Sequence, residues 1–252
     1  MADHGFHVIA PGVQLHFGYA GMVLIGILAV LAFRVTKDIT SPRDRRAYYT
    51  LQSITIVAAL LGAKLAVLMG DALWPIEAFD HWWELLWSGR SIVGALLIGF
   101  VAAEAAKPLL RYSLPPNDRF AIVLPISIAI GRIGCHLAGC CQGTTYDGAL
   151  AIRDAAGVGR YPIPQFELIF HALMALLLLR LYRAKALQGR LFAIYVTAYG
   201  AFRFATEYLR DTSKVFFEHS AYQWFALALL LFGAVFIYLH NPARKAQREV
   251  TI

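Results

Sequence analysis

The chain has 252 residues, of which 59% are apolar and only 15% are charged, and its formal net charge is +7. A soluble domain carries about 25% charged residues, so the composition argues against a soluble enzyme and for a polytopic membrane protein. The positive charge suits basic cytoplasmic loops better than nucleic-acid binding.

The apolar segments predict an all-α membrane protein with seven transmembrane helices in a single domain over residues 1–252. A helix needs about 20 mostly apolar residues to cross the hydrocarbon core. No secretory signal peptide is expected, because no basic residue precedes the first apolar run. The predicted spans are 15–33, 49–70, 91–110, 119–137, 164–182, 190–209 and 221–240.

Basic residues in the connections predict the orientation of these helices. Lys and Arg gather at 34–46, 107–119, 180–190 and 244–248, in every second connection and in the tail. By the positive-inside rule these segments are cytoplasmic. We therefore expect the N-terminus outside and the C-terminus in the cytoplasm.

Two further segments are expected on the outer face. Residues 74–88 contain several Trp and acidic residues and are predicted to form an interfacial helix or loop, with the aromatic rings at headgroup level. Residues 138–163 form a long outer loop. Arg90 opens the third span from the same side.

Three cations fall inside predicted spans, where an unpaired charge costs several kcal/mol. Lys64, Arg132 and Arg203 each lie about 5–6 residues before the outer end of a helix, roughly 7–10 Å below the interface. Few carboxylates accompany them, so we expect them to bind an anion, and the nearest abundant anion is a phospholipid headgroup. Arginine suits phosphate because it donates two parallel hydrogen bonds. Snorkelling to the interface is the alternative, chiefly for Lys64.

The neighbours of the two arginines strengthen this interpretation. Gly131 and Gly134 flank Arg132 and would let a ligand or another helix approach closely. Glu207 follows Arg203 at i+4, so the two side chains share a helix face and can pair. That pair could also be purely structural.

The outer loop ends in a polar segment that leads into the fifth span. Pro162 and Pro164 interrupt regular structure there, and Gln165 and Glu167 follow at the outer mouth. His171 lies one turn deeper than Glu167, so the two could form an acid–base pair. An ordinary helix start with a satisfied histidine is the alternative.

Four short sequence motifs, taken together, are more specific than any one of them alone. They are Gly62–Lys64, Gly131–Cys135 followed by Gly143, Tyr161–Glu167, and Ala198–Arg203 followed by Glu207 and Arg210. In order and spacing they resemble the motifs of the bacterial prolipoprotein diacylglyceryl transferases. The resemblance extends over most of the chain.

The resemblance implies an activity without a cofactor or metal. A transferase of this family moves the diacylglyceryl group of phosphatidylglycerol to the lipobox Cys thiol of a preprolipoprotein, at the outer leaflet of the bacterial inner membrane. The departing glycerol phosphate needs cations, and the thiol needs a base. The expected catalytic residues are Arg132, Arg203, Glu207, Tyr199 and His136, and the expected substrate-binding residues are Lys64, Arg90, Ser91, Gly131, Gly134, Gly143, Gln165, Glu167 and Arg210.

The chain departs from the family at the position of its expected base. The family has a Ser-x-His-Gly-Gly segment in the third span, and Val93 stands here at the His position. Cys135 and Ala138 replace two Asn of the signature stretch. One alternative is that no dedicated base is needed, because arginines near the acceptor thiol would lower its pKa. The candidate replacement bases are His136, Glu167, His171 and Glu207.

The cysteines of the chain, Cys135, Cys140 and Cys141, lie close together and give no disulfide framework. No metal is expected, because no second ligand cluster accompanies them and His136. A transient nucleophile at Cys135 or Cys140 is one alternative, and packing between helices is another. Two other functions also stay open: a related transferase with a non-lipoprotein acceptor, and a non-catalytic protein that binds or moves anionic lipid.

Overall fold

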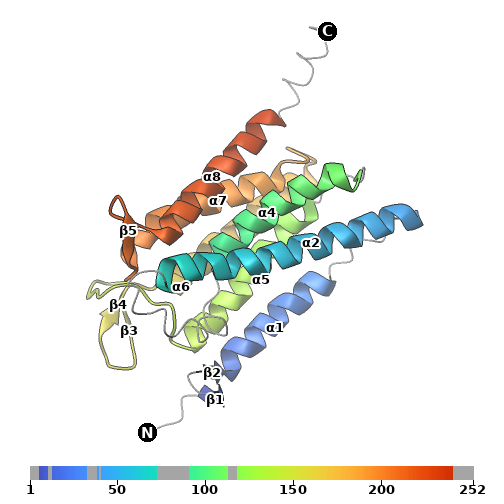
Figure 1. Ribbon diagram of the computed structural model, residues 1–252. Coiled ribbons are helices and arrows are strands. Elements are labelled where there is room, and N and C mark those ends of the chain that lie inside the picture. The colour runs from blue at the N-terminus through green and yellow to red at the C-terminus, as the bar shows by residue number, and fades with distance from the viewer. Residues whose placement is uncertain are drawn as a thin grey trace. The chain divides into compact units, whose positions relative to one another are not determined.

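The computed structural model describes residues 6–10, 13–32, 39, 41–72, 91–112 and 118–240. Helices dominate this part of the chain (Figure 1), in agreement with the predicted all-α class. The predicted outer-face segment 74–88 and Arg90 lie outside the described residues. The α-helices among the described residues are α1 (Phe17–Ala32), α2 (Pro42–Val67), α4 (Ile92–Leu109), α5 (Asp118–Leu137), α6 (Ile163–Arg183), α7 (Leu191–Thr206) and α8 (Ala221–Leu239).

Five helices of the described residues, α2, α4, α5, α6 and α8, are long and apolar enough to cross a membrane. The other two, α1 and α7, have 16 residues each. At 1.5 Å per residue each is about 24 Å long, slightly less than a hydrocarbon core of about 30 Å. The structure therefore supports a multi-pass membrane protein with five spanning helices, and the predicted count of seven requires turns beyond the ends of α1 and α7.

Helix α2 begins at Pro42, well before the predicted position 49. Ser41 is its N-cap, and the Ser41 Oγ accepts a hydrogen bond from Asp44 N at 3.5 Å. A proline fits the first helical turn because its missing N–H would have no partner there, and Asp44 suits the positive end of the helix dipole. The apolar pattern missed this start because the first turns are charged. At its other end α2 continues as a π-helical turn, Leu68–Ala72.

Three short antiparallel hairpins complete the described secondary structure. They are β1 (Phe6–Ala10) with β2 (Val13–His16), β3 (Ile152–Arg153) with β4 (Gly159–Arg160), and β5 (Lys214–Phe216) with β6 (His219–Ser220). The sequence patterns did not predict them, since strands this short carry too little alternation to stand out. The β3–β4 hairpin gives the predicted outer loop a fixed structure.

The chain folds into two compact units. The first contains Met1–Arg34, Arg119–Arg183 and Tyr208–Asp211, and the second contains Val35–Asp118, Ala184–Glu207 and Thr212–Ile252. The first unit therefore holds α1, nearly all of α5, and α6. The second holds α2, α4, α7 and α8. Each is described below by itself.

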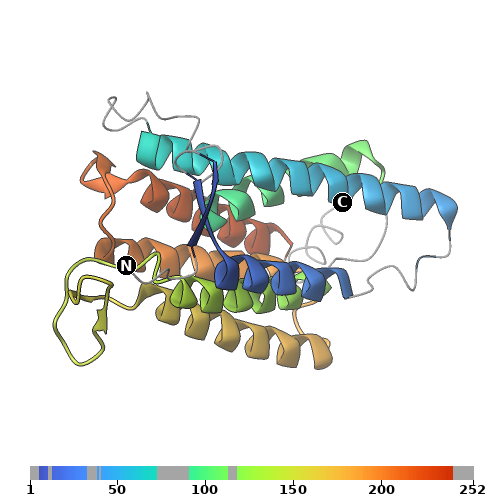
Figure 2. The same ribbon diagram turned by 90° about the horizontal axis from the view of Figure 1, so that it is seen from below.

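In the first unit, small residues let α1 pack against α5 (Figure 2). A Cβ at Gly134 would lie 3.0 Å from Met22 Cβ and 3.1 Å from Tyr19 Cα, so α1 leaves room only for a glycine. Close approach through small residues is the usual way in which membrane helices associate. The prediction that Gly134 allows close helix approach is thus confirmed.

In the second unit, α2 packs against α4, and α7 against α8. A Cβ at Gly62 would overlap the Gly94 carbonyl oxygen, and one at Gly94 would lie 2.6 Å from Ala66 Cβ. Backbone contact is close enough for Ser91 N to donate a hydrogen bond to Ala63 O at 3.3 Å. The stretch Gly62–Lys64 therefore has a packing role, whatever Lys64 does beyond it.

Candidate functional site

A buried carboxylate on α6 joins two arginines in the first unit. The Glu167 side chain is 0% exposed, and its Oε1 accepts a hydrogen bond from Arg210 Nη2 at 2.7 Å. Its Oε2 forms an ion pair with Nη2 of Arg132, which comes from α5. The two guanidinium groups are themselves only 13% and 11% exposed. Two cations and one anion leave this cluster with a net charge of +1.

The cluster corrects the expectation that few carboxylates balance the buried cations. Glu167 was expected to bind substrate, or to act as a base with His171. Both of its oxygens are already paired with guanidinium groups, which leaves it poorly placed to act as a base. Its ion pairs instead hold Arg132 and Arg210 in fixed positions. His171 is also 0% exposed, deep in the same helix.

His136 lies one turn beyond Arg132 on the same face of α5, at i+4. Its ring is exposed, and Nδ1 lies 2.5 Å from Gln165 Nε2. Gln165 precedes Glu167 by two residues. The polar start of α6 therefore contacts α5 twice, through Gln165 at His136 and through Glu167 at Arg132. The structure thus brings four of the expected site residues in this unit, Arg132, His136, Gln165 and Glu167, to one interface between two helices.

Gly143 is fixed by backbone contacts of the loop between α5 and α6. Its N–H donates to Tyr161 O at 2.9 Å, and Thr144 N donates to Leu209 O at 2.9 Å. A Cβ at Gly143 would lie 2.7 Å from Tyr161 Cβ and would overlap Leu209 O. These contacts join the loop to the segment that carries Arg210. At Gly131, by contrast, the described residues beyond its own stretch of helix leave open space around an added Cβ, so no described helix packs closely there, and the close approach of a ligand stays a prediction.

In the second unit, Arg203 and Glu207 form the predicted i, i+4 ion pair. Arg203 Nη1 lies 2.6 Å from Glu207 Oε2, and the carboxylate is 0% exposed. Glu207 Oε1 accepts hydrogen bonds from Thr212 Oγ1 at 3.0 Å and Ser220 Oγ at 3.1 Å. Both carboxylate oxygens are already engaged by these partners, so Glu207 is better placed to position Arg203 than to act as a base. This cluster is neutral, unlike the one around Glu167.

Helix ends hold two of the predicted buried cations. Lys64 lies in the last α-helical turn of α2, and the candidate span continues through the π-helical turn to Gly70, six residues beyond Lys64, as predicted. Arg203 lies in the last turn of α7, which the 3-10 turn Glu207–Leu209 follows. Cations at this position interact favourably with the helix dipole. Arg132 lies five residues before Leu137, the last residue of α5, as predicted.

Three other sequence positions of interest lie in the second unit. Tyr199 is 0% exposed and stacks between neighbours on α7, with its ring 6.4 Å from Tyr195. Ser91 is the N-cap of α4, where its Oγ accepts from Gly94 N at 3.4 Å. Val93, at the position of the family's histidine, is 1% exposed and packs in the apolar core. Its side chain offers no proton acceptor.

An apolar pocket lies at the start of α8 in the same unit. Its volume is about 340 Å³. Such a lining can accept a hydrocarbon chain and offers nothing to a charged group. It is lined by Met69, Val215, Phe216, Phe217, Ala221, Trp224 and Phe225.

Sequence reasoning missed the link between Glu167 and the two arginines. Arg210 was expected as a substrate-binding residue and Glu167 as a substrate-binding residue or a base, and no spacing rule relates residues of different elements. The available signal was energetic: Arg132 lies in an apolar span and needs a buried partner. The convergence of the three cysteine side chains was missed for a similar reason, since a turn after α5 creates it.

Comparison with known proteins gives a consistent result. A family model described as prolipoprotein diacylglyceryl transferase matches residues 7–239. A phosphatidylglycerol–prolipoprotein diacylglyceryl transferase of Clostridium tetani is 25% identical over 237 residues, which cover 91% of this chain and 94% of that protein. Proteins with the same name from Bordetella parapertussis and Cupriavidus necator are 27% and 25% identical, over 89% and 94% of this chain and 91% and 96% of their own lengths.

Proposed function

The chain belongs to the prolipoprotein diacylglyceryl transferase family, and we propose that it transfers the diacylglyceryl group of phosphatidylglycerol to the lipobox cysteine thiol of a prolipoprotein. The names of its relatives contain both substrates. The thiolate attacks the glycerol carbon that carries the phosphate, the carbon–oxygen bond breaks, and glycerol phosphate leaves with the electron pair. A thioether forms, and the thiol proton passes to a base or to water.

The net charge of the Glu167 cluster is the observation that carries this proposal. The phosphodiester of phosphatidylglycerol has one negative charge, and the cluster of Arg132, Glu167 and Arg210 has one positive charge in excess. Guanidinium groups fixed by a buried carboxylate need little reorganisation when charge develops on the leaving phosphate. We assign Arg132 and Arg210 to the phosphate and Glu167 to their positioning.

The family resemblance assigns Arg203 to the phosphate as well, with Tyr199 and Glu207 as its support. Arg203 lies in the second unit, where Glu207 already compensates its charge. Its role is therefore a separate proposal with its own test. The same holds for Lys64 and Ser91, of which Ser91 already has a capping role in the fold.

His136 is the base that the geometry favours. Glu167 and Glu207 already form ion pairs, and His171 is fully buried. His136, by contrast, has an exposed ring one helical turn from Arg132. To accept the proton on Nε2, the ring must donate from Nδ1 to the amide oxygen of Gln165. That oxygen is buried and has no hydrogen-bond partner among the described residues. A turn of the Gln165 amide would satisfy it and leave His136 Nε2 ready to take the proton.

We also propose the finer topology that the sequence predicts. The chain forms one transmembrane domain with seven spans in the bacterial inner membrane, with its N-terminus outside and the site at the outer leaflet. The basic residues at 107–119 and 180–190 support this orientation. Reporter fusions after residues 112 and 240 test it, since both should report a cytoplasmic location. A periplasmic signal from either fusion would contradict the orientation.

The function is tested with purified protein in vesicles of phosphatidylglycerol and a lipobox peptide. Mass spectrometry of the peptide and an assay of released glycerol phosphate should show equal amounts of both products. A matched peptide with Ser in place of the lipobox Cys should stay unmodified. Release of glycerol phosphate without peptide modification would overturn the proposed acceptor and favour another one. Binding of the lipid without any release would favour a lipid-binding protein.

A further inference from the structure

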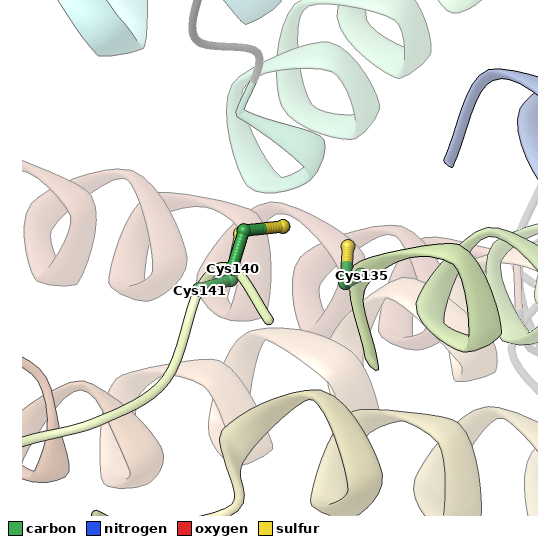
Figure 3. Close-up of side chains that lie close together, drawn as sticks. All are labelled: Cys135, Cys140 and Cys141. Carbon is green, nitrogen blue, oxygen red and sulfur yellow. The ribbon is translucent and has the colours of Figure 1, made fainter. Parts of the chain in front are cut away.

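All three cysteines of the chain converge in the first unit, at the end of α5 (Figure 3). Their Sγ atoms all lie within 4.8 Å of one another, and those of Cys140 and Cys141 are 3.6 Å apart. The thiols are free. Cys135 is buried, Cys140 is partly buried and Cys141 is exposed, so the group reaches from the core to the surface.

The turn after α5 creates this convergence. Gly139 adopts a φ of +63°, which suits glycine, and Gly139 N donates to His136 O at 3.1 Å. Cys140 N then donates to Cys135 O at 3.1 Å, which folds the chain back over the helix end. Cys141 has a φ of 64° as well. The sulfur atoms therefore come together through backbone geometry that the fold fixes locally.

We propose that Cys135, Cys140 and Cys141 bind one thiophilic metal ion of the Zn²⁺ or Cu⁺ type. Soft thiolate ligands select such ions. A Zn–S bond of about 2.3 Å places two sulfur ligands roughly 3.8 Å apart in tetrahedral geometry and about 4.0 Å apart in trigonal geometry. The observed separations are 3.6 Å between Cys140 and Cys141 and no more than 4.8 Å for the other pairs, so a bound ion needs sulfur shifts of about 1 Å or less.

A disulfide fits the same sulfur atoms less well. It needs sulfur atoms about 2.05 Å apart and a specific dihedral angle, and neighbouring cysteines reach this only with strain. A covalent catalytic role for these thiols is also unfavourable. A thiol that took up the diacylglyceryl group would become a thioether, which is as stable as the product and would stop turnover.

Arg132 Nη1 donates to Cys135 Sγ at 3.5 Å, so a guanidinium group faces the sulfur that would carry negative charge as a ligand. A thiol that coordinates a metal ion is deprotonated on binding. The exposed side of Cys141 leaves space for a water molecule as a fourth ligand of Zn²⁺, while Cu⁺ needs only the three sulfur atoms. This site was not expected from the sequence, because no second ligand cluster accompanies the cysteines and His136.

Metal titrations of the purified, reduced protein test the proposal without reference to transfer activity. Zn²⁺ with a competing chelator, Co²⁺ as a spectroscopic probe, and Cu⁺ under anaerobic conditions should give one ion per chain for at least one metal. Co²⁺ should produce sulfur-to-metal charge-transfer absorbance. Elemental analysis of protein purified without added metal identifies the ion carried from the cell.

Variants locate the site. Each of Cys135→Ser, Cys140→Ser and Cys141→Ser should weaken binding by about tenfold or more, since loss of a supporting group alone costs 10–100-fold. The triple variant should not bind, and circular dichroism checks that it folds. Cys141 lies on the surface, so Cys141→Ser remains informative if Cys135→Ser fails to fold. One-to-one binding that persists in the triple variant, or no binding of any of the three metals by the parent protein, would overturn the proposal.

Discussion

Replacement of Glu167 by Gln is the perturbation whose size the structure determines best. The change removes one negative charge and leaves Arg132 and Arg210 buried with a net charge of +2. Loss of one partner from a buried ion pair destabilises by about 3–5 kcal/mol, and here one carboxylate contacts two guanidinium groups. We therefore expect the free energy of unfolding of Glu167→Gln to fall by at least about 3 kcal/mol, and transfer activity to be lost.

The measurement is reversible unfolding in mixed detergent micelles, with Asp154→Asn as the matched control. Asp154 also pairs with an arginine, Arg160 Nε at 2.5 Å, but this arginine side chain is 34% exposed. A solvent-accessible pair of this kind contributes little to stability. The double variant Glu167→Gln/Arg210→Met restores the net charge of +1 and should be more stable than Glu167→Gln alone. Equal losses in Glu167→Gln and Asp154→Asn would refute the reasoning.

Three further predictions concern other parts of the molecule. Gly143→Ala should destabilise by about 1–3 kcal/mol, because its Cβ would lie 2.7 Å from Tyr161 Cβ, whereas Gly131→Ala, which has open space, should be neutral or slightly stabilising in the same unfolding assay. The hydrogen bond from Arg160 lowers the pKa of Asp154, so this contact stabilises the β3–β4 loop above the ordinary pKa of about 3.9 and is lost as the pH falls through the lower folded value. The amides of Ala156 and Val158 donate to Asp154 Oδ1, so their protection from hydrogen exchange, relative to an unstructured peptide at the same pH, should fall at acid pH. Unchanged protection would contradict the assignment. Arg203→Ala should abolish transfer of the diacylglyceryl group. Full activity in a folded variant would contradict the proposal that Arg203 binds the phosphate.

Local patterns predicted the parts of the structure that depend on neighbours in sequence. The spacing of Arg203 and Glu207 predicted their ion pair because residues four apart share a helix face. The apolar segments located every long helix among the described residues, but the start of α2 at Pro42 was missed. Its signal, a Ser–Pro cap followed by an acidic first turn, is present in the sequence, and hydropathy alone does not detect it.

The missing parts depend on tertiary contacts that no periodicity encodes. Glu167 meets Arg132 on another helix and Arg210 on a third segment. The role of Gly143 comes from contacts with Tyr161 and Leu209 in the folded loop. For both, sequence motifs identified the correct residues and gave no indication of their partners.

Removal of Glu167 and removal of an arginine test different claims. The first tests what positions the cations, and the second tests whether a cation acts on the leaving group at all. Arg132→Gln keeps much of the side-chain length and removes the charge, and Lys107→Gln provides a control for loss of a cation from an exposed pair on α4.

Single-turnover release of glycerol phosphate from phosphatidylglycerol, measured for the parent protein and for folded Arg132→Gln, tests the central claim most directly. We expect the parent protein and Lys107→Gln to release glycerol phosphate in step with peptide modification. We expect a loss of at least about a hundredfold in Arg132→Gln, the size expected when a preorganised donor to a developing negative charge is removed. Release at the parental rate by Arg132→Gln would contradict the claim.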